Sequence, residues 1–308
     1  MRLGIFLGDF TGVTDMDGML RQIVSVEDDG YDAAWLGQIF GPDALTLIAL
    51  AGQRTGRIEL CTSVVPTYPR HPFVMAQQTL TAQSATRGRL VLGIGLSHQI
   101  VIENMWGLSY EHPAHHMREY LSVLLPLIRE GKVGFQGEVF RVSGALQVPG
   151  ATPFPVLLAA LAPAMLRMAG ETADGTITWM TGVKTIATHI VPRITAAAEA
   201  AGRPHPRIVV GLPVAVTEDP AGARERAGQA FALYGQLPSY RRMLDIEGAA
   251  GPADVAIVGN EDEVEAEIRA FAAAGATDFA AAVFPAGGDP AMSVGRTRAL
   301  LKTLAGRL

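Results

Sequence analysis

The chain has 308 residues, of which 49% are hydrophobic and 18% charged, and its 25 Lys and Arg against 30 Asp and Glu give a net charge of −5. This composition excludes a disordered chain, because there is ample apolar side-chain volume for a core. It also disfavours binding to nucleic acid, since no basic run is longer than the pair Arg241–Arg242.

Eight short apolar segments predict β-strands. Continuous apolar runs of this length are typical of parallel strands that helices cover on the outside. The segments are residues 3–8, 33–37, 58–65, 89–95, 155–160, 175–179, 208–216 and 278–284.

Between these segments, apolar residues recur at spacings of three and four, which predicts helices. The predicted helices are residues 17–29, 43–54, 72–85, 114–130, 163–173, 184–201, 219–234, 261–274 and 290–306. Asp17, Asp43 and Asp289 are candidate N-caps. Gly30, Gly131, Gly202 and Gly275 stand where helices should end.

Eight strand–helix units in one chain favour an α/β fold, a (β/α)8 TIM barrel with insertions, formed by residues 1–308 as a single domain. An open dinucleotide-binding sheet should carry G-x-G-x-x-G after its first strand, but that turn contains only Gly8 and Gly12. Gly93-Ile94-Gly95 lies inside a predicted strand and lacks the third glycine.

Two segments interrupt the alternation. Residues 132–148 alternate polar and apolar positions, which predicts a small antiparallel hairpin. Residues 235–260 follow the aromatic Tyr234, include Tyr240 and the pair Arg241–Arg242, and continue into a Gly/Ala/Pro-rich run. This excursion follows the seventh barrel strand, so we interpret it as a lid; a purely structural excursion is the alternative.

The single Cys61 excludes an internal disulfide or a multi-cysteine metal site, and a buried, inert thiol is expected. No apolar run is long enough for a membrane helix, and the chain begins directly with a strand-like segment. We therefore expect a soluble cytoplasmic protein that does not contact membranes.

In a TIM barrel, residues that follow the carboxyl ends of the strands form the active site. Here these positions are mostly uncharged: Asp9, Gln38, residues 63–70, residues 96–99, residues 160–165 and residues 179–181. Of the histidines, only His98 is at a strand end.

Hydrolysis is therefore disfavoured at this site. His112, His115 and His116 lack the H-E-x-x-H pattern of a zinc helix, and G-x-S-x-G is also absent. A metal-dependent hydrolase stays the less favoured alternative, and no metal is expected. A site with so few charged side chains instead favours a bound organic cofactor that supplies the reactive chemistry.

A flat, flavin-like ring fits the third strand best. Pro66, Pro69 and Pro72 follow that strand closely, and such a segment can push backbone toward a planar ring. A phosphate tail would bind where small residues expose N–H groups, at residues 95–98 or 159–163. Ordinary short loops are the alternative at both places.

Three segments resemble the bacterial-luciferase-like flavin-dependent oxidoreductase superfamily: SVVPTYPRHP, AQQTLTAQSATRGRLVLGIGLSHQ and LLAALAPAMLRMAGETADGTITW. The chain looks most like the branch that uses the deazaflavin coenzyme F420. That branch includes methylenetetrahydromethanopterin reductase and the F420-dependent glucose-6-phosphate and alcohol dehydrogenases. The resemblance covers nearly the whole chain.

The resemblance implies a homodimer and a non-proline cis peptide at Ser63–Val64, behind the cofactor ring. It further implies that residues 95–98 and 160–163 lie along the cofactor tail, with Thr178 and Trp179 beside the ring or substrate. The residues expected to bind cofactor are Thr62, Ser63, Val64, Val65, Gly95, Leu96, Ser97, His98, Ala159, Ala160, Leu161, Ala162, Pro163, Thr178 and Trp179.

The chain departs from several F420-dependent dehydrogenases, which carry an Asp-His pair after the second strand and a Glu after the fourth. Gly37-Gln38 and His98 stand at the matching positions. Because glutamine cannot act as a base, His98 is the proton-transfer candidate, or else a partner for the cofactor tail. Gln38 is expected to hydrogen-bond substrate or ring, and Asp9 is a further catalytic candidate.

The sequence therefore predicts an F420-dependent oxidoreductase that moves a hydride between C5 of the deazaflavin and a small organic substrate. An FMN-dependent luciferase-like monooxygenase is the nearest alternative. A non-catalytic ligand-binding accessory protein is the alternative from another class.

Overall fold

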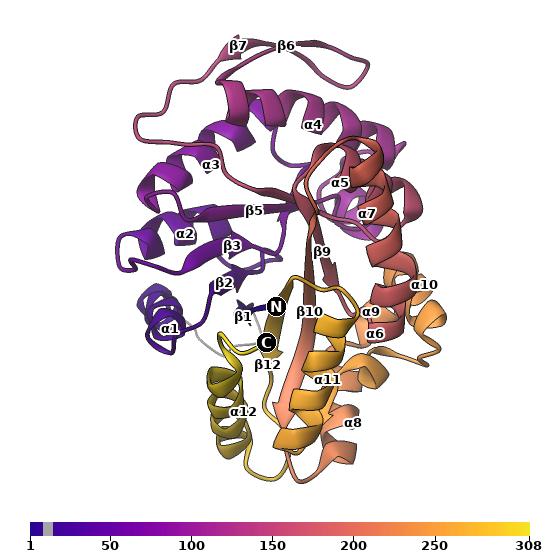
Figure 1. Cartoon of the computed structure of the whole chain (residues 1–308). Coiled ribbons are helices and arrows are strands. Elements are labelled where there is room, and N and C mark those ends of the chain that lie inside the picture. Colours follow the sequence, from indigo (N-terminus) through magenta and orange to yellow (C-terminus); the bar gives the residue numbers. More distant parts are fainter. Residues whose placement is uncertain (9–14) are drawn as a thin grey trace.

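The computed structural model describes residues 1–8 and 15–308, and its centre is a closed barrel of eight parallel strands (Figure 1). Each strand pairs with the next one around the barrel, and the pairs β12–β1 and β9–β10 complete the circle. The predicted TIM barrel is confirmed. The barrel strands are β1 (Arg2–Leu7), β2 (Ala33–Leu36), β3 (Glu59–Thr62), β5 (Leu90–Gly95), β8 (Val156–Ala159), β9 (Gly175–Trp179), β10 (Arg207–Val216) and β12 (Asp278–Val283).

Helices surround the barrel and cover its outer face (Figure 1). They are α1 (Met16–Asp28), α2 (Ala44–Gly52), α3 (Pro72–Ala85), α4 (Pro113–Glu130), α5 (Pro163–Thr172), α6 (Val183–Thr185), the π-helix η3 (Ile186–Ile190), α7 (Val191–Ala200), α8 (Pro220–Ala230), α9 (Ala232–Gln236), α11 (Glu261–Ala273) and α12 (Pro290–Leu304). The predicted helix 184–201 is thus divided by a π-helical turn, and the predicted helix 219–234 breaks at Phe231.

The carboxylates of Asp43 and Asp289 accept the N–H groups of Thr46 and Met292, as predicted for N-caps. The prediction for α1 was wrong by two residues. Asp15 accepts the N–H of Gly18 and is the N-cap, whereas Asp17 lies within the first turn of the helix. The predicted glycines end their elements with φ between 65° and 100°, in the left-handed region that L side chains avoid. They are Gly30, Gly131, Gly202 and Gly275.

Side chains along each barrel strand alternate between the interior and the surrounding helices. In β3, Leu60 belongs to the outer core with the helices, whereas Cys61 belongs to the inner cluster. The inner cluster comprises Phe6, Ala33, Trp35, Cys61, Val91, Leu157, Ile177, Val209, Ala280 and Ala282. Cys61 is fully buried there, and burial raises the pKa of its thiol, as expected for an inert cysteine.

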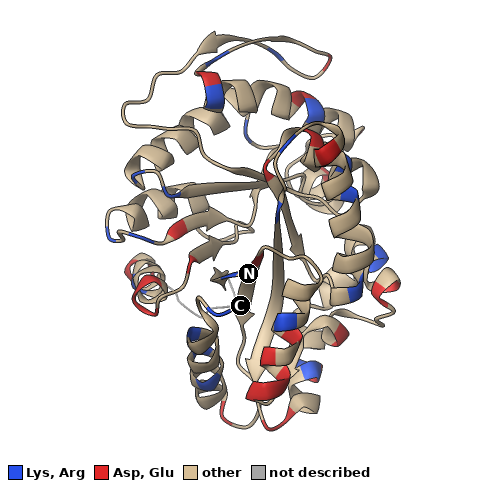
Figure 2. Cartoon of the chain, viewed as in Figure 1, with Lys and Arg blue, Asp and Glu red and all other residues tan. Residues whose placement is uncertain are grey.

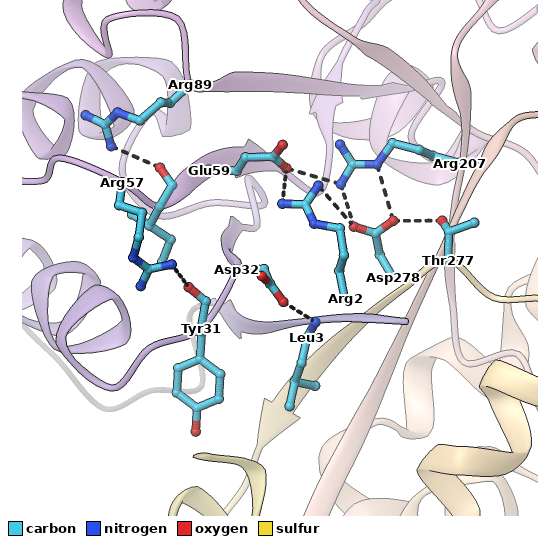
Figure 3. Close-up of polar contacts among 11 residues, drawn as sticks. Arg2, Leu3, Tyr31, Asp32, Arg57, Glu59, Arg89, Arg207, Thr277 and Asp278 are labelled. Atoms are coloured by element: carbon cyan, nitrogen blue, oxygen red, sulfur yellow. Dashed lines mark hydrogen bonds and ion pairs between the residues drawn. The ribbon is translucent and has the colours of Figure 1, made fainter. Parts of the chain in front are cut away.

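Four charged side chains close the amino-terminal end of the barrel, where Figure 3 shows them pointing toward one another. Arg207 makes a two-pronged contact with Asp278, at 2.5 and 3.2 Å, and its Nη2 is 3.2 Å from Glu59. Arg2 is 2.9 Å from the same Glu59 oxygen. Although burial opposes its charge, hydrogen bonding and attraction to these carboxylates raise the pKa of Arg207. Charge pairing therefore stabilises this end.

The predicted hairpin is present as β6 (Lys132–Gln136) paired antiparallel with β7 (Arg141–Ala145). The buried carboxylate of Glu119 on α4 accepts the backbone N–H groups of Glu138, Val139 and Phe140 at 2.8–2.9 Å. Burial opposes its charge, but these hydrogen bonds lower the pKa of Glu119. A single carboxylate thus anchors the turn of the hairpin to the body of the barrel.

The excursion at 235–260 carries more structure than its Gly/Ala/Pro-rich composition predicts. It contains α10 (Pro238–Glu247), the 3-10 turn η4 (Pro252–Val255) and β11 (Ile257–Gly259), which extends the sheet beside β10. The short strand β4 (Val65–Pro66) and the π-helix η2 (Ile100–Met105) also escaped prediction. Among the described helices, none has both the length and the apolar character required to cross a membrane.

Candidate functional site

The carboxyl end of β3 changes direction at Ser63–Val64, the peptide bond that the resemblance singled out, and this bond is cis. The Ser63 N–H donates to the Leu36 carbonyl at 2.7 Å, and the chain then pairs with β5 through β4. The Val64 side chain packs against the inner cluster and lies over two glycines of β5. A Cβ on Gly95 would be only 2.8 Å from Val64 Cγ2, so glycine is needed to admit this side chain.

Trp179, at the carboxyl end of β9, is the other partly buried side chain that caps the inner cluster. Its ring stacks on Phe6 of β1, with the centroids 5.1 Å apart. Phe231 and Tyr234 meet its ring edge-on, and Phe231 also meets Phe284 after β12. The Trp179 Nε1 is buried and has no hydrogen-bond partner within the described part of the chain. Aromatic rings thus form one wall of the barrel mouth.

His98 lies in the loop after β5 and is partly buried. Its ring contacts Tyr240 of α10, with the centroids 5.6 Å apart, and Tyr240 in turn meets Tyr234 edge-on at 5.2 Å. Burial lowers the pKa of His98, which favours the neutral imidazole at pH 7. The aromatic residues of the predicted lid therefore connect the proton-transfer candidate to the Trp179 wall.

Gln38 and Asp9 are the other two predicted catalytic residues. Gln38 follows β2, and its Oε1 accepts the N–H of Ala44 at 3.2 Å, so its carbonyl is already engaged at the start of α2. Asp9 lies outside the described residues.

Two residues expected to bind cofactor have their side chains engaged in the sheet. Thr62 Oγ1 donates to the Gly93 carbonyl and accepts the Gly93 N–H, at 2.7 and 2.8 Å. Thr178 Oγ1 donates to the Val209 carbonyl at 3.2 Å. Both follow inward-facing neighbours along their strands, so their side chains point away from the barrel interior. Only their backbone can face a ligand in the barrel.

The remaining expected residues form two loops beside Val64. A Cβ on Gly95 would be 3.1 Å from Ala159 Cβ, so the ends of β5 and β8 are adjacent. Ser97 has φ 59°, in the left-handed region, and its carbonyl accepts the Tyr110 hydroxyl at 3.3 Å. Ala162 precedes α5 and provides no side-chain cap, while Pro163 occupies its first turn. The segments that follow β5 and β8 thus begin side by side and carry small or apolar side chains.

Sequence reasoning missed a second aromatic group beside these loops. Tyr68 stacks on His116 with nearly parallel rings, 4.1 Å between centroids, and also stacks on Tyr110. The Tyr68 hydroxyl and His116 Nε2 are buried without partners in the described chain, and burial lowers the pKa of His116 to about 4. The fixed spacing of His112, His115 and His116 drew attention to metal ligation, but His115 instead contacts Glu119 at 3.1 Å. Within residues 1–8 and 15–308, no three His, Cys, Asp or Glu side chains are grouped as metal ligands.

At the barrel mouth, Val64 therefore presents an aliphatic surface, and Trp179 with its neighbouring rings presents an aromatic one. The luciferase-like monooxygenase family model matches residues 1–278. An uncharacterized Mycobacterium tuberculosis protein is 30% identical over 240 residues, 73% of this chain and 70% of that protein.

Other relatives have named activities. An F420-dependent glucose-6-phosphate dehydrogenase from Nakamurella multipartita is 31% identical over 58% of this chain and 57% of that enzyme. Among solved structures, the coenzyme F420-dependent tetrahydromethanopterin reductase from Methanopyrus kandleri has a TM-score of 0.79, with 20% identity over 100% of this chain and 98% of that one. The FMN complex of a 3,6-diketocamphane monooxygenase from Pseudomonas putida has a TM-score of 0.77, with 16% identity over 99% and 96%. These matches show that this TIM-barrel chain belongs to the luciferase-like monooxygenase family of oxidoreductases.

Proposed function

We propose that the protein is an F420-dependent oxidoreductase that transfers a hydride between C5 of the deazaflavin and a small organic substrate. The observation that carries the proposal is the pair of walls at the barrel mouth. Val64 lies on one side, over Gly93 and Gly95, and Trp179 stacked on Phe6 lies on the other. Relatives named as F420-dependent enzymes favour deazaflavin as the planar group.

The residues present fit such a group. Trp179 Nε1 and Thr67 Oγ1 are buried polar atoms without partners in the described chain, and a bound polar heterocycle would supply partners for them. Residues 63–65 would support the ring through their backbone and the Val64 side chain. Thr62 and Thr178 would contribute backbone alone, because their hydroxyl groups are occupied.

The tail of the coenzyme would lie along Gly95 to His98 and Ala159 to Pro163. The N-terminus of α5 has no side-chain cap, so its free N–H groups favour an anion such as a phosphate. When bound, the deazaflavin supplies the hydride chemistry. The protein holds the ring and excludes water from it, and neutral His98 exchanges a proton with the substrate oxygen.

Two coenzyme titrations test the proposal. Reduced F420 should bind with micromolar affinity, while protein purified under mild conditions should retain no FMN. A yellow protein that carries FMN would refute F420 dependence and support the monooxygenase alternative, which the FMN-containing structural neighbour keeps open. Binding of neither coenzyme would favour the accessory-protein alternative.

We also propose that two copies of the chain associate through α2 and α3. Neither helix contains a charged residue, and both are tan in Figure 2. Leu50 and Val74 are each 44% exposed on these helices, an apolar surface that a second copy would bury. Light scattering should give the mass of a dimer, and Leu50→Lys should give a monomer; a monomeric parent would refute the proposal. The cytoplasmic location and the single domain spanning 1–308 stay predictions.

A further inference from the structure

Large apolar side chains are exposed around the mouth of the barrel. Ile39 and Phe40 follow β2, and Phe40 is 63% exposed. A second group lies between β5 and α4, and Leu233 on α9 is 61% exposed. We call the set the apolar rim: Ile39, Phe40, Ile100, Met105, Leu108 and Leu233.

The rim lies at one end of the molecule. In a parallel barrel, segments that follow the carboxyl ends of strands gather at the same opening. Leu233 is next to Tyr234, whose ring meets Trp179, so α9 borders this opening too. Single exposed apolar side chains are ordinary on protein surfaces, but a set that gathers at one opening marks a binding surface.

Below the rim, the aromatic side chains around Trp179 are also apolar. Phe6, Trp179, Phe231 and Phe284 form a chain of ring contacts from the barrel interior outward. A ligand that enters past the rim would therefore meet aromatic rings along this wall of the barrel.

Three carboxylates on the same segments already have partners within the protein. Asp43 pairs with Arg70, and Glu103 accepts the Gln99 side-chain amide at 2.9 Å. Glu247 of α10 accepts the N–H and the hydroxyl group of Thr185, both at 2.7 Å. These carboxylates are therefore not free to bind a polar group of the substrate.

From the apolar rim and the wall beneath it, we propose that the substrate is a neutral molecule with a bulky hydrocarbon body, which the rim covers while its reactive carbon reaches the ring. This inference rests on the proposed function and names the substrate class of that same site.

Straight-chain 2-alkanones from 2-butanone to 2-decanone provide the test. Titration calorimetry on the full chain, with and without oxidised F420, would measure each dissociation constant. Burial of one methylene contributes about 0.8 kcal/mol, so the dissociation constant should fall about threefold to fourfold per added carbon. In the double variant Phe40→Ser/Leu233→Ser, the decrease should flatten to less than about twofold per carbon for the longer ketones, while the melting temperature shows that the barrel is folded.

Val139→Ser is the matched control, because Val139 is 46% exposed on the hairpin turn and not on the rim. It should retain the gradient of the parent. An affinity independent of chain length, an unchanged gradient in the double variant, or tighter binding of glucose 6-phosphate than of 2-decanone would each overturn the inference. Co-sedimentation with phosphatidylcholine vesicles that Phe40→Ser abolishes would also overturn it, by assigning the rim to a membrane.

The two proposals fail separately. Binding of F420 without a chain-length gradient would refute the substrate class and leave the coenzyme in place. A gradient without any F420 binding would refute the coenzyme and leave an apolar ligand site.

Discussion

A methyl group on Gly95 tests whether the position of Val64 determines coenzyme binding. The added Cβ in Gly95→Ala would lie 2.8 Å from Val64 Cγ2 and 3.1 Å from Ala159 Cβ. Carbon atoms prefer about 3.5–4.0 Å, so Val64 must move by about 0.7 Å or more. Its way out is toward the mouth, because the inner cluster fills the space below. The displaced side chain would then occupy the position proposed for the ring.

The expected energies follow from this crowding. Overpacking a buried position typically costs about 1–3 kcal/mol, and replacing a strand glycine returns about 0.5–1 kcal/mol. Gly95→Ala should therefore lower the free energy of unfolding by about 0.5–2 kcal/mol. Coenzyme affinity should fall by about tenfold or more, since 1.4 kcal/mol of lost contact corresponds to a factor of ten.

A double-mutant cycle gives the decisive measurement. Val64→Ala removes the atoms that clash, so Gly95→Ala/Val64→Ala should bind F420 more tightly than Gly95→Ala, with a coupling energy of about 1 kcal/mol. Fluorescence titration of F420 measures affinity, and urea unfolding measures stability. Gly134→Ala on β6 is the control, because nothing lies within 4 Å of its added Cβ. Parental F420 affinity in Gly95→Ala, or additive effects of the two substitutions, would refute the role assigned to Val64.

Three further predictions address the hairpin, the charged amino-terminal end of the barrel, which we call the floor, and the proton-transfer candidate His98. Glu119→Gln replaces an oxygen that accepts the Val139 and Phe140 N–H groups, so it should cost about 2 kcal/mol at pH 7. Because the folded-state pKa of Glu119 is lowered, this difference in the free energy of unfolding should persist above about pH 4.5 and disappear as the pH falls through that lower pKa. A difference, measured by urea unfolding, that does not shrink in acid would contradict the prediction. The control Glu130→Gln, on the same helix, should leave the free energy of unfolding nearly unchanged. Arg207→Met should lower the free energy of unfolding by about 3–5 kcal/mol. The reason is that Asp278, whose side chain is only 3% exposed, keeps just the 3.8 Å contact with Arg2 as an ion pair. The control Arg269→Met, which breaks an exposed i,i+4 pair, should lower it by about 0.5 kcal/mol or less. His98→Asn should lower kcat by about 100-fold or more and remove the acid limb of the pH–rate profile. In the parent protein this limb should lie below pH 6.5, because burial lowers the pKa of His98. An acid limb that is unchanged in the variant would show that His98 does not transfer the proton.

The barrel strands could be predicted because each is a continuous apolar run, a local signal that needs no knowledge of its neighbours. The floor could not be predicted, because Arg2 and Asp278 belong to strands at opposite ends of the chain and meet only when β12 pairs with β1. The structure within 235–260 was missed for a related reason. β11 has three residues, and its pairing with β10, not its sequence, makes it a strand.

Prediction of the site had a different limit. The position of the cis peptide came from the family resemblance of the segment around Ser63–Val64. Whether a given strand residue faces inward depends on the register of the barrel, and a fully apolar strand carries no alternation that reveals it. Thr62 and Thr178 were therefore expected beside the cofactor, although both hydroxyl groups bond to neighbouring strands. Phe6, whose ring supports Trp179, went unnoticed for the same reason.

The two ends of the barrel differ in their chemistry, and this difference separates stability from function. At the amino-terminal end, Arg2, Glu59, Arg207 and Asp278 satisfy one another, so the charges there are committed to closing the barrel (Figure 3). At the carboxyl end, the described walls are aromatic or aliphatic, and neutral His98 is the titratable group proposed to act. Because the ion pairs that close the barrel lie at the floor, the mouth does not need charged side chains for that purpose. Substitutions at the floor should therefore change stability with coenzyme affinity unchanged in the folded fraction, whereas substitutions of the exposed rim residues should change substrate affinity with little change in stability.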